Sequence, residues 1–223
     1  MLHRPLLLIG LLVALNGPAL AADLQVTVNT AAGRPAADVV VMVLPAVRGP
    51  APALAEGTSI VQRDNRFEPY VTAVPAGTTV RFVNRDRYDH HVRSLGSGPM
   101  GAVPPAKSFE LRLAGVQAGA AKASAEVLFD TAGSVVLGCH IHGSMRGHVF
   151  IANTPWVAVT DEFGRATLRG LPDGTAELRL WHPDQLAAQA TQTLQLQGAV
   201  TAQAALGFTP QRRPPPRPQS DYN

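Results

Sequence analysis

The chain has 223 residues, of which 46% are hydrophobic and 16% charged, and its formal net charge of +3 is small. It carries no basic stripe interleaved with aromatic residues, which argues against a nucleic-acid-binding protein. Glycine (20) and proline (19) are plentiful and no long helical pattern occurs, so we expect many short strands joined by turns.

The N-terminus has the features of a secretion signal. Arg4 gives a basic start, and the apolar run from Pro5 to Leu15 is too short to span a bilayer. Ala19-Leu20-Ala21 is a small-residue cleavage pattern, so residues 1–21 are predicted to be a signal peptide. The alternative is a membrane anchor, but no stop-transfer pattern follows. We therefore expect an exported, periplasmic protein with no membrane segment after cleavage.

Two strands are predicted before residue 46. Leu24, Val26 and Val28 alternate with polar residues, which is typical of a half-buried strand. A turn at 33–35 follows, and then an apolar strand over 39–44. Residues 46–57, rich in alanine, glycine and proline, are interpreted as a linker or long loop.

A second group of strands is predicted after residue 58. Its segments are 59–62, 71–74, 80–82, 109–113, 127–129, 135–137 and 149–151. The stretch 114–125 is rich in alanine and glycine and indicates a flexible excursion. A third group follows Pro155, with strands over 166–168, 178–180, 194–196 and 200–206. Asp184 is predicted to cap a short helix through Ala190. Residues 207–223 are predicted to be a disordered tail.

The single cysteine marks a candidate metal site. It lies in the run Cys139-His140-Ile141-His142-Gly143-Ser144-Met145. Two histidines and a cysteine in a trigonal set with a distant axial methionine form an electron-transfer copper site. A lone thiol in an exported protein cannot form an internal disulfide, and metal ligation would protect it. The second histidine must come from elsewhere, and His90-His91 offers one.

Residues 58–153 resemble a cupredoxin, the blue-copper β-sandwich family that includes plastocyanin and amicyanin. The resemblance is carried by motifs in family order: Phe67-x-Pro69, Gly77-x-x-Val80-x-Phe82-x-Asn84, His90-x-Val92, Phe129-Asp130-x-x-Gly133 and Cys139-x2-His142-x2-Met145-x-Gly147-x-Val149. It implies one type 1 copper ion held by His90, Cys139, His142 and axial Met145. It also implies that the exposed edge of His142 is the electron port.

The chain departs from this pattern at two positions. His91 stands where relatives place an asparagine that braces the ligand loop, so His91 is an alternative to His90 as ligand. Successive strand residues point in opposite directions, so only one of them is expected to face the metal, and alignment with Val92 favours His90. Gly138 replaces an aromatic residue that often precedes the cysteine. His140 and His148 are expected to be exposed near the rim. Zinc is a possible contaminant of the site.

The third group of strands resembles a carboxypeptidase regulatory-like β-sandwich through Thr160-Asp161-x-x-Gly164-Arg165-Ala166 and Leu171-Pro172-x-Gly174. Gly33-Arg34-Pro35 and the apolar strand after it supply the usual opening of such a domain. The hypothesis is a discontinuous sandwich, 23–48 plus 155–206, into which a cupredoxin domain over 49–154 is inserted. The alternative is a single decorated domain with an N-terminal extension.

The fold class expected is therefore all-β: a cupredoxin Greek-key β-sandwich plus a second small β-sandwich. Four short motifs also make the chain resemble exported plastocyanin-like proteins of the methylamine utilisation group: His90-His91-Val92, Gly138-Cys139-x-Ile141-His142, Thr154-Pro155 and Trp181-His182-Pro183. The function expected is a periplasmic copper protein that carries single electrons and is not an enzyme. Its expected partner is a periplasmic redox protein, either a c-type cytochrome or a dehydrogenase. Copper storage or delivery, and non-redox binding or adhesion, remain as alternatives.

Overall fold

The computed structural model describes residues 21–47, 49–54, 57–117 and 123–211. The expected signal peptide therefore lies outside the described residues, except Ala21, which opens the first strand. Within the described ranges the chain is all-β, as expected, with a single 3-10 helix over Pro99–Gly101. No helix in this part of the chain is long and apolar enough to cross a bilayer.

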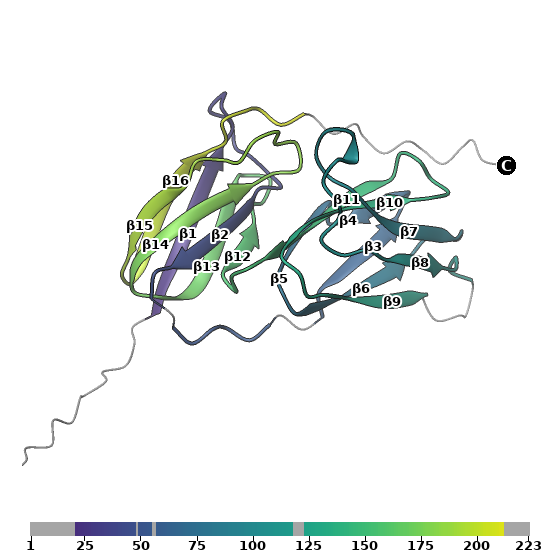
Figure 1. Cartoon of the computed structure of the whole chain (residues 1–223), viewed down its shortest axis with the longest axis horizontal. Helices are drawn as coiled ribbons and strands as arrows, with labels where there is room; N and C mark the ends of the chain where they lie inside the picture. Colours follow the sequence, from purple (N-terminus) through teal and green to yellow (C-terminus); the bar gives the residue numbers. More distant parts are fainter. Residues whose placement is uncertain (1–20, 48, 55–56, 118–122, 212–223) are drawn as a thin grey trace, which may run out of the picture.

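The strands form two sandwiches that lie side by side (Figure 1). One is built from the middle of the chain: β3 (Ser59–Arg63), β4 (Arg66–Glu68), β5 (Val71–Pro75), β6 (Thr78–Asn84), β7 (His90–Leu95), β8 (Glu110–Leu113), β9 (Ser124–Phe129), β10 (Gly133–Cys139) and β11 (Arg146–Ala152). The other uses both ends of the chain: β1 (Ala21–Asn29), β2 (Val40–Pro45), β12 (Val157–Val159), β13 (Arg165–Pro172), β14 (Gly174–Trp181), β15 (Gln192–Leu196) and β16 (Ala199–Ala205).

The middle sandwich packs a five-stranded sheet, in the order β5-β11-β10-β7-β8, against a four-stranded sheet, β4-β3-β6-β9. Alternation along β6 buries Val80 and Phe82 and exposes Thr79 and Arg81, as the sequence predicts. The core includes Ile60, Phe82, Phe129, Leu137, Cys139 and Met145. The end of the sandwich that holds the cysteine is thus continuous with its hydrophobic core.

The second sandwich pairs strands from the two ends of the chain. One sheet has the order β13-β1-β16, and the other has the order β12-β2-β14-β15. Leu24 lies opposite Leu168 on β13, and Val43 lies opposite Leu178 on β14. The strands before residue 46 therefore pair with strands after residue 155, and none of them pairs with the middle sandwich.

An apolar junction joins the two sandwiches. Trp181 of β14 packs against Phe150 of β11 with ring centroids 4.9 Å apart. Strands β5 and β12 are adjacent there, as Figure 1 shows. His148 of β11 lies in this junction: its Nε2 is 3.1 Å from the Tyr70 hydroxyl, and its ring faces Trp181. The prediction that His148 is an exposed rim residue is therefore wrong, because packing between sandwiches covers this face of β11.

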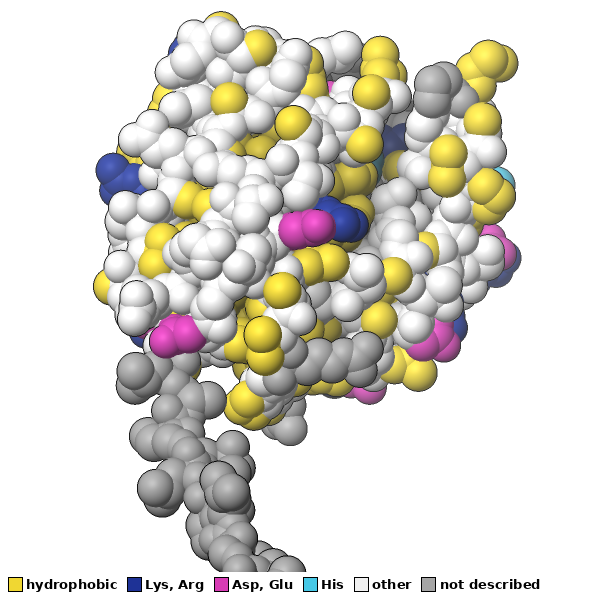
Figure 2. Space-filling model, turned by 60° about the vertical axis from the view of Figure 1, so that its left-hand side comes forward, with side chains coloured by type: hydrophobic (Ala, Val, Ile, Leu, Met, Phe, Trp, Pro, Cys, Tyr) yellow, Lys and Arg dark blue, Asp and Glu magenta, His cyan; other side chains and the backbone are white. Residues whose placement is uncertain are grey.

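Two expectations for the C-terminal part also need correction. No helix forms over residues 184–190, which adopt turns and irregular backbone. Residues 207–211, assigned to the tail, are held in place: Phe208 packs on the core of the second sandwich and the Gln211 amide donates to Asp184 Oδ2. The remainder of the predicted tail, 212–223, lies outside the described residues. On the face that the second sandwich brings forward, charged side chains are few, and an acidic and a basic side chain lie side by side near its centre (Figure 2).

Candidate metal centre

The candidate ligands gather at one end of the middle sandwich. His90 is the first residue of β7, and Cys139 is the last residue of β10. These strands are antiparallel neighbours with Cys139 opposite Val92, so the two side chains meet at the same end of the sheet. The short loop from β10 to β11 carries His142 and Met145. Its turn is closed by the Met145 amide, which donates to the His142 carbonyl at 2.9 Å.

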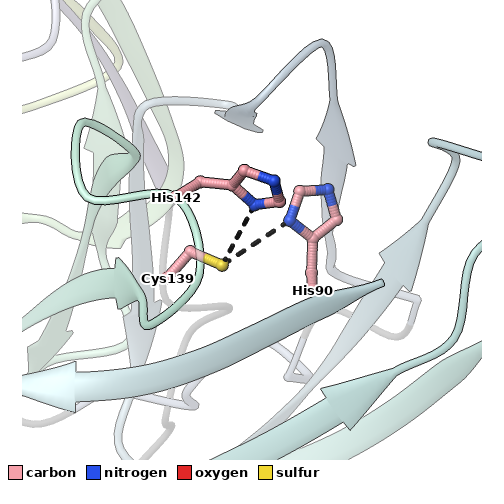
Figure 3. A group of neighbouring side chains, drawn as sticks. All are labelled: His90, Cys139 and His142. Carbon is pink, nitrogen blue, oxygen red and sulfur yellow. Dashed lines mark hydrogen bonds between the residues drawn. The ribbon is translucent and has the colours of Figure 1, made fainter. Parts of the chain in front are cut away.

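Three donor atoms converge within this end of the sandwich. Cys139 Sγ lies 3.7 Å from Nδ1 of His90 and 3.5 Å from Nδ1 of His142 (Figure 3). The ligand atoms of all three residues lie within 4.8 Å of one another. His90 and Cys139 are 1% and 3% exposed, whereas His142 is half-buried. Met145, 1% exposed, belongs to the same buried cluster as Cys139.

The structure places His90, and not His91, beside the cysteine. His91 points to the other side of the strand, where its Nε2 pairs with Glu110 and its ring lies against the exposed His140. This is the alternation that adjacent strand residues must follow. His140 is exposed, as expected, and is not among the three converging residues.

Two residues near the histidines have contacts that sequence reasoning missed. The Tyr88 ring lies edge-on to both His90 and His142, with centroids 5.3 and 5.2 Å away. Asp86 Oδ2 lies 2.8 Å from Nε2 of His90. Both residues belong to the polar segment between β6 and β7, which lacks the apolar alternation that identifies strands. No signal in the sequence indicated the contact between Asp86 and His90, because a spacing of four residues brings side chains together only on a helix and this segment is not helical.

Asp86 is itself held by several donors. Its carboxylate accepts hydrogen bonds from the amides of Asp64 at 2.8 Å and Asn65 at 3.4 Å. Those two residues form the β3–β4 turn with φ of 50° and 57°, a left-handed backbone that aspartate and asparagine tolerate well. The Asp86 amide donates to Asn84 Oδ1 at 2.8 Å. Asn84 is fully buried, and the two N–H groups of its Nδ2 are shared among three carbonyls, those of Tyr88, Leu113 and Ala114.

The local electrostatics favour charged forms of the buried acid groups. Burial raises the pKa of the Cys139 thiol, but hydrogen bonds, first among them that from His90, outweigh burial and lower the pKa to about 6. Burial likewise raises the pKa of Asp86, yet hydrogen bonds from His90 and from the Asp64 and Asn65 amides bring that pKa below its ordinary value. Cys139 is therefore prepared to act as a thiolate, the form that binds metals.

Gly138 precedes the cysteine for a visible packing reason. A Cβ at this position would lie 2.6 Å from Leu95 Cδ1. Leu95, from neighbouring β7, thus occupies the space beside the strand where a side chain at position 138 would begin.

The donor set fits one type 1 copper ion. A thiolate and two imidazole nitrogens converge, and a buried thioether follows on the same loop. Thiolate and thioether are soft donors that suit copper, and a cysteine with two histidines and a weak methionine is typical of blue copper sites. Zinc can also bind the cysteine and the two histidines, but it gains little from a thioether.

Comparisons with known proteins give matches among solved structures only. No protein-family model matches the chain, and no curated protein matches it. A purple cupredoxin from Nitrosopumilus maritimus is 19% identical and covers 43% of this chain and 99% of its own, with a TM-score of 0.34. Amicyanin from Paracoccus versutus is 18% identical and covers 52% of this chain and 100% of its own, with a TM-score of 0.34. A copper-containing nitrite reductase from Thermus scotoductus is 25% identical over 48% of this chain and 25% of the enzyme, with a TM-score of 0.36.

Proposed function

We propose that the protein is a periplasmic type 1 copper protein of cupredoxin type that carries single electrons between redox partners and is not itself an enzyme. The observation that supports this most is the convergence of Cys139 Sγ with the Nδ1 atoms of His90 and His142. Met145 would be the weak axial donor. Copper bound by this set would supply one-electron chemistry, since it is stable as both Cu(I) and Cu(II).

The chain's own residues provide the rigidity that electron transfer needs. His90 is fixed by Asp86 on one side, and Cys139 is fixed by pairing of β10 with β7 and β11. Donors held by a sheet move little when the charge of a bound ion changes, which keeps the reorganisation small. His142 is the one half-buried member of the set, so it is the route by which electrons reach the surface.

The burial of the donors favours electron transfer over copper delivery. A delivery site exchanges its metal through ligands that a partner can reach. Here His90, Cys139 and Met145 are each no more than 3% exposed. The partner we propose is a periplasmic redox protein, a c-type cytochrome or a dehydrogenase, that approaches the His142 end.

We also propose that the copper-binding sandwich, 49–154, is an insertion in the second sandwich, 23–48 plus 155–206. The chain on the two sides of the insertion supports this, because β2 of the first host segment is hydrogen-bonded to residues 154 and 156, where the chain returns to the host sandwich. Thr154 Oγ1 donates to the Val43 carbonyl at 2.7 Å, and the Val43 amide donates to the Trp156 carbonyl at 3.0 Å. Insertions are tolerated where the ends of the inserted segment lie close together.

Voltammetry of copper-loaded protein tests the electron-carrier proposal. We expect one copper per chain, a reversible one-electron wave, and retention of copper when the reduced protein meets a moderate Cu(I) chelator. His90→Ala should lose the wave, whereas the adjacent His91→Ala should behave as wild type. Rapid loss of copper to the chelator without a reversible wave would support delivery instead. Failure to bind copper would overturn the copper assignment.

A further inference from the structure

A buried carboxylate lies behind the most deeply buried histidine of the candidate site. Nε2 of His90 is 2.8 Å from Asp86 Oδ2, and Nδ1 on the other side of the ring is 3.7 Å from Cys139 Sγ. The imidazole therefore lies between a carboxylate and the thiol. The side chains of His90 and Asp86 are only 0% and 6% exposed, so water screens this arrangement poorly.

This contact determines which nitrogen of His90 is available to a metal. An ionised carboxylate can only accept hydrogen bonds, so Nε2 of His90 must be protonated and donate the hydrogen bond to Asp86. Nδ1, which faces Cys139, is then the nitrogen left to bind a metal in place of its contact with the thiol (Figure 3). A carboxylate behind a metal-binding histidine fixes the ring and raises its basicity.

Asp86 is held in this place independently of His90. The amides of Asp64 and Asn65 donate to its two oxygens, and its own amide donates to buried Asn84. A carboxylate that already accepts these bonds can point at His90 without moving, so it is a preformed part of the site. The nearest cationic side chains in sequence, Arg85 and Arg87, are exposed and have no ion pair with it among the described contacts.

The negative charge of Asp86 acts differently on the two oxidation states. Together, the Asp86 carboxylate and the Cys139 thiolate place two negative charges at the site. These balance the charge of Cu(II) but exceed that of Cu(I) by one. In a poorly screened site this imbalance favours the more positive ion. The carboxylate should therefore lower the reduction potential.

From these contacts we propose that Asp86 is a positioning residue that selects the Nδ1-binding form of His90 and holds the copper site at a low reduction potential. This inference rests on the proposed copper site. It assigns to the segment between β6 and β7 a role in setting the potential, in addition to the ligands themselves.

The test compares Asp86→Asn with Asp89→Asn. The side-chain oxygen of asparagine at 86 can still accept the hydrogen bond from His90 Nε2–H, but asparagine lacks the charge. Asp89 belongs to the same segment and is exposed, and within the described part of the chain its carboxylate accepts a hydrogen bond only from the Gly115 amide, so its variant removes equal charge without removing a contact of the His90 ring. We expect Asp86→Asn to bind copper and to favour Cu(I) at least tenfold more than wild type, which is a rise of about 59 mV for one electron. Asp89→Asn should stay near wild type. Equal potentials in the two variants would overturn the proposal.

A measurement on the unaltered protein covers the case in which Asp86→Asn does not fold, as judged by circular dichroism. Nitrogen-15 NMR of metal-free and Cu(I)-loaded protein should show a slowly exchanging His90 Nε2 proton in both, with only Nδ1 shifted by the metal. A metal-induced shift at Nε2 instead of Nδ1, or a rapidly exchanging Nε2 proton, would overturn the proposal. Absence of copper binding with an intact Nε2 proton would instead overturn the proposed function and leave the Asp86–His90 pair in place.

Discussion

His90 and Cys139 are 49 residues apart in sequence, yet their Nδ1 and Sγ atoms lie 3.7 Å apart in the folded chain. Their strands are direct neighbours, so the sheet itself brings a nitrogen donor to a thiol. The contact between these atoms affects the ionisation of the thiol in metal-free protein as well as the binding of copper.

The first prediction concerns the ionisation of Cys139 without metal. Because hydrogen bonds outweigh burial and lower the pKa of the thiol to about 6, the thiolate should predominate at neutral pH. Thiolate absorbance in the ultraviolet should rise with a midpoint near pH 6, and Cys139→Ala should remove that rise. Below this midpoint protons compete with metal, so copper affinity should fall as the pH is lowered. A midpoint near the ordinary thiol value of 9.0 would contradict the geometry.

The second prediction concerns Met145. Leucine has a similar volume, so Met145→Leu should cost less than about 1.5 kcal/mol of folding free energy. The variant should keep the cysteine and both histidines, and with them its strong colour. Loss of the thioether donor should raise the reduction potential, because the axial ligand tunes that potential. An unchanged potential in voltammetry would show that the thioether of Met145 is not a ligand.

The third prediction tests how the N-terminal strand is held in the second sandwich. Gly164 has φ of 73°, and a Cβ there would overlap with the Val28 carbonyl oxygen of β1. Gly170 has a similar φ of 67°, but a Cβ there would meet nothing within 4 Å. Gly170→Ala should therefore cost about 1–2 kcal/mol from the left-handed backbone alone. Gly164→Ala should cost a further amount, about 1–3 kcal/mol, from overlap.

Chemical denaturation of both glycine variants measures this difference. Equal destabilisation would mean that Val28 does not approach position 164, which would also remove support for the discontinuous second sandwich.

Much of the architecture follows from local patterns. Alternation identified the strands around Val26 and Phe82, and the same alternation separated His90 from His91. The candidate ligands could be named from the sequence because the loop after Cys139 carries two of them at short, regular spacing.

The features that could not be predicted from the sequence depend on contacts between segments that are distant along the chain. Asp86 is oriented by the amides of the turn at 64–65, and no local pattern shows that this turn lies beside it. His148 was misplaced because its cover comes from the other sandwich, through Trp181. Phe208 was assigned to the tail because the residues after it are polar or proline, but its side chain packs on the core of the second sandwich.

The visible absorption spectrum of the mature protein after addition of Cu(II) tests the central claim most directly. A thiolate bound to Cu(II) gives an intense charge-transfer band, expected at about 600 nm for a type 1 site. We predict this band in wild type and its complete loss in Cys139→Ala. A wild-type protein that stays colourless with Cu(II), or a band that survives in Cys139→Ala, would contradict a type 1 copper site at His90, Cys139, His142 and Met145.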